Sequence, residues 1–177
     1  QFNLLRDNHD QLFQAVGIME ASLKDGKKIL VFGNGGSSTQ ASHLEAELVN
    51  KFYFQRGALA ALALTTDIAN MTSIANDMDY RFIFSRQLEA LGRPGDVAVG
   101  LSTSGKSANV LEALKVAKGM NIRTVALCGQ YTGDLEAAGT DAIVPVQSKD
   151  TPTIQEIHLF FLHTMAEILE NNFFKGE

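Results

Sequence analysis

The stretch DVAVGLSTSGKS, residues 96–107, joins a short apolar segment to a loop of small hydroxyl residues. Residues 96–101 have the continuous apolar character of a buried strand, and the loop leads into a helix expected to end at about Gly119. The stretch KKILVFGNGGSS, residues 27–38, has the same order of strand and turn, and a helix is expected after it over 39–51. Apolar strands separated by helices predict βαβ units and a parallel sheet.

The rest of the chain extends this alternation. Further strands are expected over 59–64, 122–128 and 142–146. Further helices are expected from the start to about Lys24, over 67–74, over 80–91, and from Pro152 to about Asn171. This order predicts an α/β domain with a doubly wound, flavodoxin-like, five-stranded parallel sheet flanked by helices and an extra N-terminal helix. In such sheets ligands bind at the carboxyl ends of the strands.

Composition and charge narrow the classes of function. The 177 residues suit a single domain, and a net charge of −5 argues against nucleic acid as the main ligand. No apolar run approaches the roughly 20 residues that span a bilayer, and residues 1–10 show no signal peptide. The single cysteine, Cys128, allows neither an intrachain disulfide nor a cysteine metal cluster. We therefore expect a cytoplasmic protein with no membrane partner, and small phosphorylated ligands remain open to it.

The two loops after the strands are candidate phosphate sites. The glycines at 33, 35 and 36 do not have the spacing of the dinucleotide fingerprint, because position 38 is Ser38, and a plain strand-to-helix turn explains them equally well. The segment from Gly100 to Ser107 matches the P-loop expression, but the strands that follow it end without the carboxylate that would help to hold magnesium. Four hydroxyls at a helix N-terminus instead predict a site for a terminal phosphate; they belong to Ser102, Thr103, Ser104 and Ser107.

Candidate acid, base and metal-binding residues lie on two expected helices. His43 and Glu47 are spaced i,i+4 and therefore share one helix face, although such a pair alone fits a solvated surface. The last helix carries Gln155, His158 and His163. Gln155 and His163 are separated by about 12 Å of helix rise, so both could reach one metal ion only by converging from opposite ends. A histidine within an apolar helix is typically part of the core, and we assign His158 to it.

Several of these segments together resemble the phosphoheptose isomerases, which are sugar isomerase (SIS) domain proteins. The segments are GNGGSS, HLEAE, LTTD, AND, STSGKSANV and TIQEIHLFFLH, in this order between about Lys27 and Leu169. The resemblance implies a homotetramer with sites at subunit interfaces and one SIS domain over 1–177. It also implies the conversion of sedoheptulose 7-phosphate to D-glycero-D-manno-heptose 7-phosphate through an enediol, the first step towards ADP-heptose for the lipopolysaccharide core.

The resemblance also assigns roles to individual residues. It implies that Glu47 is the catalytic base and His163 its partner acid/base. It implies a zinc site, one Zn²⁺ per subunit, at His43, Glu47, Gln155 and His163. It implies substrate contacts from Asn34, Gly35, Ser37, Asp67, Ser102, Thr103, Ser104, Ser107 and Gln155. Lys106 and Thr153 stand where relatives can carry Asn and Arg. Whether Glu47 acts as a free base or as a metal ligand, and whether the zinc is catalytic or structural, stays open.

Two rival functions and one assembly prediction follow. Some SIS proteins bind a phosphosugar or a protein partner without catalysis, including a relative that associates with a replication initiator, and such a binding module would not need Glu47 and His163. A nucleotide-hydrolysing enzyme is disfavoured by the missing carboxylate. The apolar stripe of residues 1–25 predicts a helix that packs in the core of an oligomer.

Overall fold

The computed structural model describes residues 2–175 of the chain, and side chains from Asn8 to Lys175. The helices are α1 (Phe2–Lys24), α2 (Gly36–Val49), α3 (Ile68–Asp77), the 3-10 helix η1 (Tyr80–Phe82), α4 (Ser85–Leu91), α5 (Ala108–Gly119), α6 (Gly133–Ala137) and α7 (Thr151–Phe174). The strands are β1 (Ile29–Gly33), β2 (Ala61–Ala63), β3 (Val97–Ser102), β4 (Arg123–Cys128) and β5 (Ala142–Pro145).

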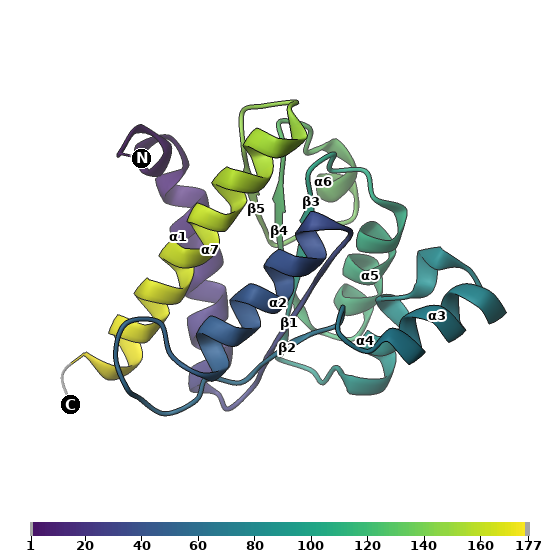
Figure 1. Cartoon of the computed structure of the whole chain (residues 1–177), viewed down its shortest axis with the longest axis horizontal. Helices are drawn as coiled ribbons and strands as arrows, with labels where there is room; N and C mark the ends of the chain where they lie inside the picture. Colours follow the sequence, from purple (N-terminus) through teal and green to yellow (C-terminus); the bar gives the residue numbers. More distant parts are fainter. Residues whose placement is uncertain (1, 176–177) are drawn as a thin grey trace.

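The five strands form one parallel sheet in the order β2-β1-β3-β4-β5 (Figure 1). The strand order reverses between β1 and β3, and the crevice at such a switch point is where doubly wound sheets bind ligands. Gly33 at the end of β1 lies opposite Leu101 near the end of β3. The predicted fold class is confirmed, and the two loops singled out in the sequence start side by side at the carboxyl edge of the sheet.

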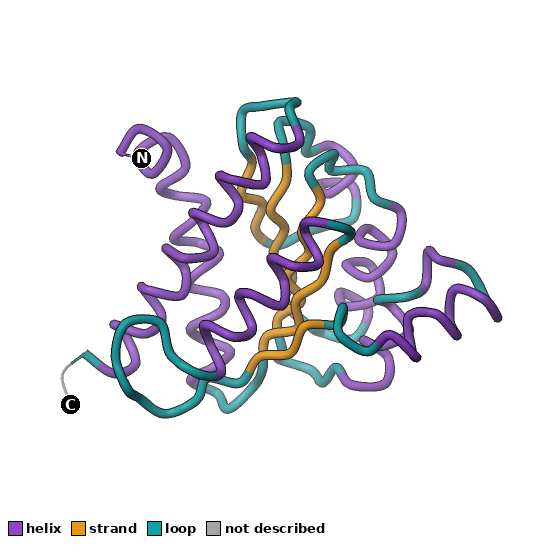
Figure 2. The backbone as a smooth tube through the Cα atoms, viewed as in Figure 1, coloured by secondary structure: helices purple, strands orange, loops and turns teal. Residues whose placement is uncertain are grey.

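Helices cover both faces of the sheet (Figure 2). Ile29 and Val31 point into a core shared with α1, α2 and α7, whereas Leu30 and Phe32 point into a second core shared with α4 and α5. All residues of β1 and β3 are buried, as expected for strands that have helices on both sides. The continuous apolar character of these strands therefore has its physical cause in the two cores.

Several predicted element boundaries were wrong. Helix α2 begins at Gly36 and not at residue 39, because Ser37 and Ser38 already donate their amides to the carbonyls of Asn34 and Gly35. The edge strand β2 has only three residues, and the expected helix over 80–91 is divided into η1 and α4. Helix α6, with five residues, was not predicted, since it is too short to show a periodic apolar pattern.

Helix α1 lies against β5 and α7, on the face of the sheet that α2 and α7 also cover. Its inward side buries Leu12, Val16 and Met19, while Phe13 on the other side is 49% exposed. Part of the apolar stripe of α1 is therefore buried within this single chain. The role of residues 1–25 in an oligomer core stays a prediction. The side chains of residues 1–7 lie outside the part of the chain that the structure describes. Within the part of the chain that the structure describes, no helix is long and apolar enough to cross a membrane.

Candidate functional site

The hydroxyl loop between β3 and α5 is closed by its own side chains. Ser102 Oγ donates to Ser107 Oγ at 2.9 Å and lies 3.5 Å from Ser104 Oγ, which accepts from the amide of Lys106 at 3.1 Å. Gly105 has φ +67, and a Cβ at this position would overlap with the carbonyl oxygen of Tyr131, so the turn requires glycine. The structure brings three of the four predicted hydroxyls together in one turn.

The start of α5 offers this turn the positive end of a helix. Ser107 is the N-cap residue, yet its side chain makes no capping hydrogen bond to the first turn of α5. Such first-turn amides are donors without an intrahelical acceptor, which favours an anion at this end. Thr103, the fourth hydroxyl residue, lines a cavity of about 450 Å³ next to the loop, together with Lys106 and Tyr131. The geometry suits a phosphate group that accepts hydrogen bonds from short hydroxyl side chains and from the first backbone amides of α5.

An amide pair connects the glycine turn to the start of α5. Asn34 Nδ2 donates to Asn109 Oδ1 and Asn109 Nδ2 donates to Asn34 Oδ1, each at 2.8 Å. The hydroxyl of Tyr80 donates to the same Asn34 oxygen at 3.0 Å. Sequence reasoning missed Asn109 and Tyr80. Asn109 lies within the motif STSGKSANV, where its place in the first turn of a helix was the available signal, while nothing in the sequence marks Tyr80.

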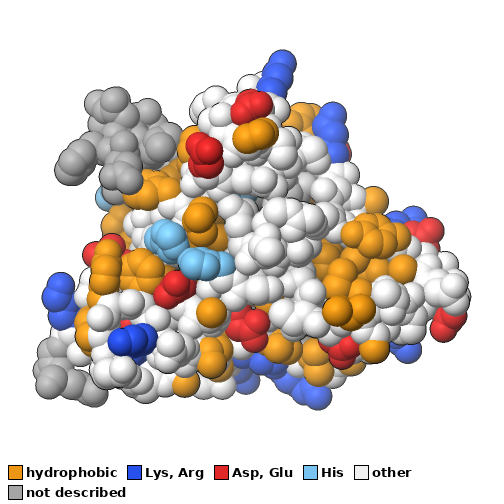
Figure 3. Space-filling view, in the orientation of Figure 1, with side chains coloured by type: hydrophobic (Ala, Val, Ile, Leu, Met, Phe, Trp, Pro, Cys, Tyr) orange, Lys and Arg blue, Asp and Glu red, His pale blue; other side chains and the backbone are white. Residues whose placement is uncertain are grey.

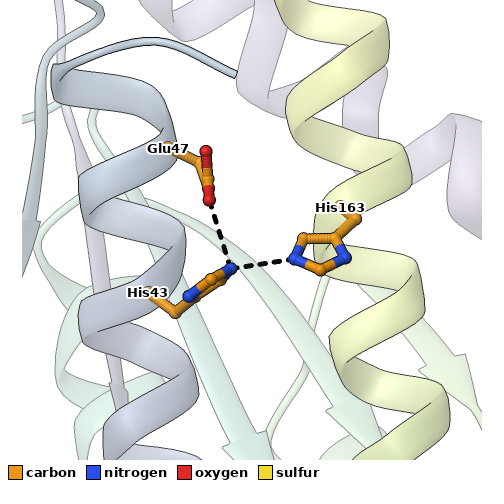
Figure 4. A group of neighbouring side chains, drawn as sticks. All are labelled: His43, Glu47 and His163. Carbon is orange, nitrogen blue, oxygen red and sulfur yellow. Dashed lines mark hydrogen bonds and ion pairs between the residues drawn. The ribbon is translucent and has the colours of Figure 1, made fainter. Parts of the chain in front are cut away.

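His43, Glu47 and His163 form one cluster between α2 and α7 (Figure 4). The Nε2 atoms of His43 and His163 are 2.8 Å apart, and His43 Nε2 lies 3.2 Å from Glu47 Oε1. One ligand atom from each residue lies within 4.8 Å of the other two, so this trio could hold a metal ion. The space-filling view shows histidine side chains beside an acidic one at the surface over α2 and α7 (Figure 3). The trio is thus open to solvent and to a ligand.

Two other predicted site residues lie apart from the trio. The Gln155 side chain lies over Gly36, where a Cβ would meet its Nε2 at 2.5 Å, and the carbonyl of Gln155 accepts from Gln40 at 2.6 Å. This places Gln155 at the first turn of α2, about 10 Å of helix rise from His43. Asp67 is exposed and caps α3, since its carboxylate accepts from the backbone and side-chain nitrogens of Asn70.

The remaining predicted sugar contacts lie close to Gln155. Ser37 is buried in the first turn of α2, and Gly35 before it has φ +55. The turn around Asn34 and the side chain of Gln155 therefore border the start of α2 together. This places them at the carboxyl edge of the sheet, next to the hydroxyl loop.

His158, which the sequence analysis assigns to the core, is buried, and so is Cys128. Burial lowers the pKa of His158 to about 4, although its contact with the carbonyl of Cys128 at 3.2 Å acts in the opposite direction. Burial also raises the pKa of Cys128 to about 12, and the charge of Glu136 adds to this. At neutral pH the buried thiol of Cys128 is protonated, which makes it a poor nucleophile and a poor metal ligand. The His158 imidazole is neutral, and it lies fully buried against the carbonyl of Cys128, away from any ligand that arrives from solvent.

The chain is similar to proteins of known family along most of its length. The SIS domain family model matches residues 3–129. The phosphoheptose isomerase of Thermodesulfovibrio yellowstonii is 44% identical over 170 residues, which cover 96% of this chain and 84% of that protein. The corresponding protein of Geotalea daltonii is 48% identical over 159 residues, covering 90% of this chain and 82% of the relative.

Solved structures agree with this similarity. A phosphoheptose isomerase from Neisseria gonorrhoeae superposes with a TM-score of 0.87 at 38% identity, covering 96% of this chain and 92% of that one. One from Francisella tularensis superposes with a TM-score of 0.91 at 33% identity, covering 96% and 90%. More distant chains, such as the NanR protein of Vibrio vulnificus at 17% identity and a TM-score of 0.65, share the fold alone.

Proposed function

This chain belongs to the phosphoheptose isomerase family of SIS-domain proteins, and from that membership we propose an aldose–ketose isomerase for a phosphorylated seven-carbon sugar. The reaction converts sedoheptulose 7-phosphate to D-glycero-D-manno-heptose 7-phosphate through an enediol. One observation carries the proposal: α2 and α7 bring a carboxylate and two imidazoles within 4.8 Å of one another at an accessible surface. A protein that only binds a phosphosugar has no need of such a trio.

The phosphate end of the substrate binds at the hydroxyl loop. Its contacts are proposed to come from Ser102, Thr103, Ser104 and Ser107, with the first amides of α5 supplying further donors. The sugar then extends along the neighbouring turn, where the proposed contacts are Asn34, Gly35, Ser37 and Gln155. Because Asn109 and Tyr80 hold the Asn34 amide, this amide would meet the sugar in a preset orientation.

The chemistry requires one base at carbon and one proton carrier at oxygen. Glu47 removes the proton from the carbon next to the carbonyl and returns it to the neighbouring carbon after the enediol has formed. His163 moves protons at the two oxygens, for which an imidazole suits neutral pH. The half-buried carboxylate of Glu47 and the ring of His163 both lie against His43 Nε2, at 3.2 and 2.8 Å, which supports their joint action (Figure 4).

The trio also fits the metal that the family resemblance implies. Two imidazole nitrogens and one carboxylate oxygen are donors that zinc prefers, and three protein ligands leave a fourth position open. His43, Glu47 and His163 would hold the ion, and bound zinc would supply polarisation of a carbonyl oxygen. Gln155 as a fourth ligand is the weaker part of this proposal, because its side chain lies over Gly36.

Spacing along α2 supports sites that are completed by a second copy of the chain. His43 and Glu47 lie about 10 and 16 Å of helix rise beyond Gly36, towards the amino edge of the sheet. The hydroxyl loop and the trio that act on one sugar therefore suit different subunits. We propose the homotetramer on this basis, with 1–177 as one SIS domain, residues 1–25 in its core, and Asp67, exposed at the cap of α3, facing the substrate from a neighbour.

The test is turnover of sedoheptulose 7-phosphate by the purified protein with added zinc, alongside Glu47→Gln. The matched control is Glu45→Gln, which removes a carboxylate from the same helix outside the trio. We expect turnover in the parent and in the control, and its loss in Glu47→Gln. Turnover that survives in Glu47→Gln would retain the reaction and exclude this base. Binding of the phosphosugar without turnover in the parent would favour the non-catalytic module.

A further inference from the structure

A buried ion pair lies near the trio and has no part in the chemistry described above. Arg56, in the loop after α2, and Glu170, near the end of α7, are 3.0 Å apart between Nε and Oε1, and each side chain is 1% exposed. Figure 1 shows this loop reaching from the end of α2 to the last turns of α7. Burying two charges is costly unless they are paired and hydrogen-bonded, so the fold must satisfy them closely.

The carboxylate of Glu170 holds the loop from inside. Its two oxygens accept the amides of Phe52 and Tyr53, each at 2.7 Å, in addition to the guanidinium. Although burial by itself raises the pKa of Glu170, these three donors outweigh it and keep the pKa below its usual value. The group is therefore a charged anchor on α7 at neutral pH.

The guanidinium of Arg56 holds the end of α2. It donates to the carbonyls of Glu47 and Leu48 at 2.6 and 2.7 Å. Carbonyls in the last turn of a helix have no intrahelical donor, and a cation is favourable at this end. The residue whose carboxylate belongs to the trio is thus bonded through its own backbone to the ion pair.

The same pair also reaches the α7 side of the trio. His163 precedes Glu170 by about two helical turns, so the two residues lie on one face of α7. The ring of Phe52, whose amide Glu170 accepts, packs 5.6 Å from the His163 ring between centroids. The loop thus contacts Glu47 through the backbone and His163 through an aromatic ring.

From these contacts we propose that Arg56 and Glu170 are positioning residues: they fix the spacing of α2 and α7 that brings His43 and Glu47 to His163. Neither residue touches the reacting atoms. The inference deepens the proposed function and rests on it for its kinetic readout. In this proposal the loop after α2 holds α2 and α7 at the spacing that the trio requires.

The chain provides a matched control for this inference. Asp96 is buried at the amino edge of the sheet, contacts Lys28 Nζ at 2.5 Å, and accepts the amides of Lys28 and Arg93 at 3.0 and 2.8 Å. Like Glu170, it is a buried carboxylate with one cation and two backbone donors, but its hydrogen bonds and its ion pair go to Lys28 and Arg93, which belong neither to α2 nor to α7 nor to the trio. Asp96→Asn therefore measures what the loss of such an anchor does to folding alone.

The experiment compares Glu170→Gln with Asp96→Asn at a temperature well below both unfolding transitions. We expect both variants to lose thermal stability, and only Glu170→Gln to lose kcat, on the order of 100-fold, with KM for sedoheptulose 7-phosphate within about twofold of the parent. Zinc affinity should fall roughly 10- to 100-fold in Glu170→Gln and stay unchanged in Asp96→Asn. Should Glu170→Gln fail to fold, Arg56→Lys takes its place, since it keeps the charge and loses the planar fork.

Two results would overturn the inference. One is a folded Glu170→Gln or Arg56→Lys whose kcat and zinc affinity match those of Asp96→Asn. The other is a crystal structure of either variant with the Nε2 atoms of His43 and His163 still 2.8 Å apart and the loop unmoved. This second readout needs neither turnover nor metal. Failure of the parent to turn over the sugar would therefore count against the proposed function and leave the positioning role open to test.

Discussion

The hydroxyl loop and the trio are built in opposite ways. The loop is one contiguous turn: Ser102 and Ser107 are five residues apart, and their hydroxyls meet at 2.9 Å because the local backbone curls around Gly105. In the trio, His43 and His163 are 120 residues apart in the chain, and their rings meet only because α2 packs on α7. The comparison shows that the proposed phosphate site depends on the local sequence, whereas the proposed reactive group depends on how two helices pack.

The difference has a consequence for what mutations do. A contiguous loop retains its form when a distant helix shifts. A substitution in the loop is therefore expected to affect substrate binding alone. A trio assembled from two helices responds to any change in their spacing, and a misplacement of 1 Å can lower a rate about 100-fold. We therefore expect substitutions at the loop to change KM and substitutions at the trio to change kcat.

The largest expected effect tests the trio. His163→Ala should lower kcat by roughly 100- to 10,000-fold, the range for loss of an acid/base group, and leave KM little changed. Steady-state kinetics with sedoheptulose 7-phosphate measures this, with Glu156→Ala as the control, because Glu156 is an exposed residue of the same helix outside the trio. A rise in KM with kcat unchanged would show that His163 acts in substrate binding, and it would contradict the contrast between the hydroxyl loop and the trio.

The second test addresses the loop. Ser104→Ala should raise KM roughly 10- to 100-fold, since a hydrogen bond to a charged phosphate contributes about 1.5–3 kcal/mol, and should change kcat little. Ser73→Ala in α3, whose hydroxyl bonds only a carbonyl of its own helix, is the control. Titration with inorganic phosphate provides a measurement independent of turnover. Equal phosphate affinity in both variants would argue against a phosphate site at the hydroxyl loop.

The third test addresses the buried histidine of α7, His158. Because burial lowers the pKa of His158 to about 4, the folded state binds fewer protons than the unfolded state between about pH 4 and 6.5. The stability is thus complete above pH 6.5 and falls as the pH is lowered towards 4. Between pH 7 and pH 5 this amounts to about 2 kcal/mol of unfolding free energy.

Urea unfolding at fixed protein concentration measures this difference. We expect His158→Gln to flatten the pH dependence by about that amount. A His158→Gln variant with the same pH dependence as the parent would contradict this assignment.

The smallest expected effect concerns the rim of the loop. Lys106 Nζ lies 4.0 Å from the ring centroid of Tyr131, a contact worth about 0.5–1 kcal/mol at an exposed site. Lys106→Asn should therefore lower the unfolding free energy by no more than about 1 kcal/mol and change KM by less than about fivefold. A larger rise in KM would show that Lys106 takes part in binding the phosphate at the hydroxyl loop. Lys149→Asn is the control, because Lys149 lines the same cavity.

Much of the fold could be predicted because its signals are local. The apolar runs at 27–32 and 96–101 predict buried strands wherever they lie in the sheet, and the structure has these strands at 29–33 and 97–102. Pro152 correctly marked the first turn of α7. The predictions failed where tertiary context decides: β2 is short because it pairs on one side only, and α6 is held by packing of Leu135.

The site divides along the same line. The four hydroxyls could be found from the sequence because they all lie within residues 102–107, and the pairing of His43 with Glu47 followed from helix geometry. The placement of Gln155 over Gly36 could not be found, since it depends on how α7 crosses the start of α2. The buried pair of Arg56 and Glu170 has no sequence signal at all, because its members are 114 residues apart.

By itself, then, the amino-acid sequence determined the alternation of strands and helices, the turn around Gly105 and the hydroxyls that line it. These depend on periodicity and turn chemistry within a few residues, which every chain segment carries with it. Only the tertiary structure decided that His163 reaches His43, that Gln155 lies apart from them, and that an ion pair ties α2 to α7. Those contacts require two helices far apart in the chain to bury apolar faces against one sheet, and their spacing is set by that packing.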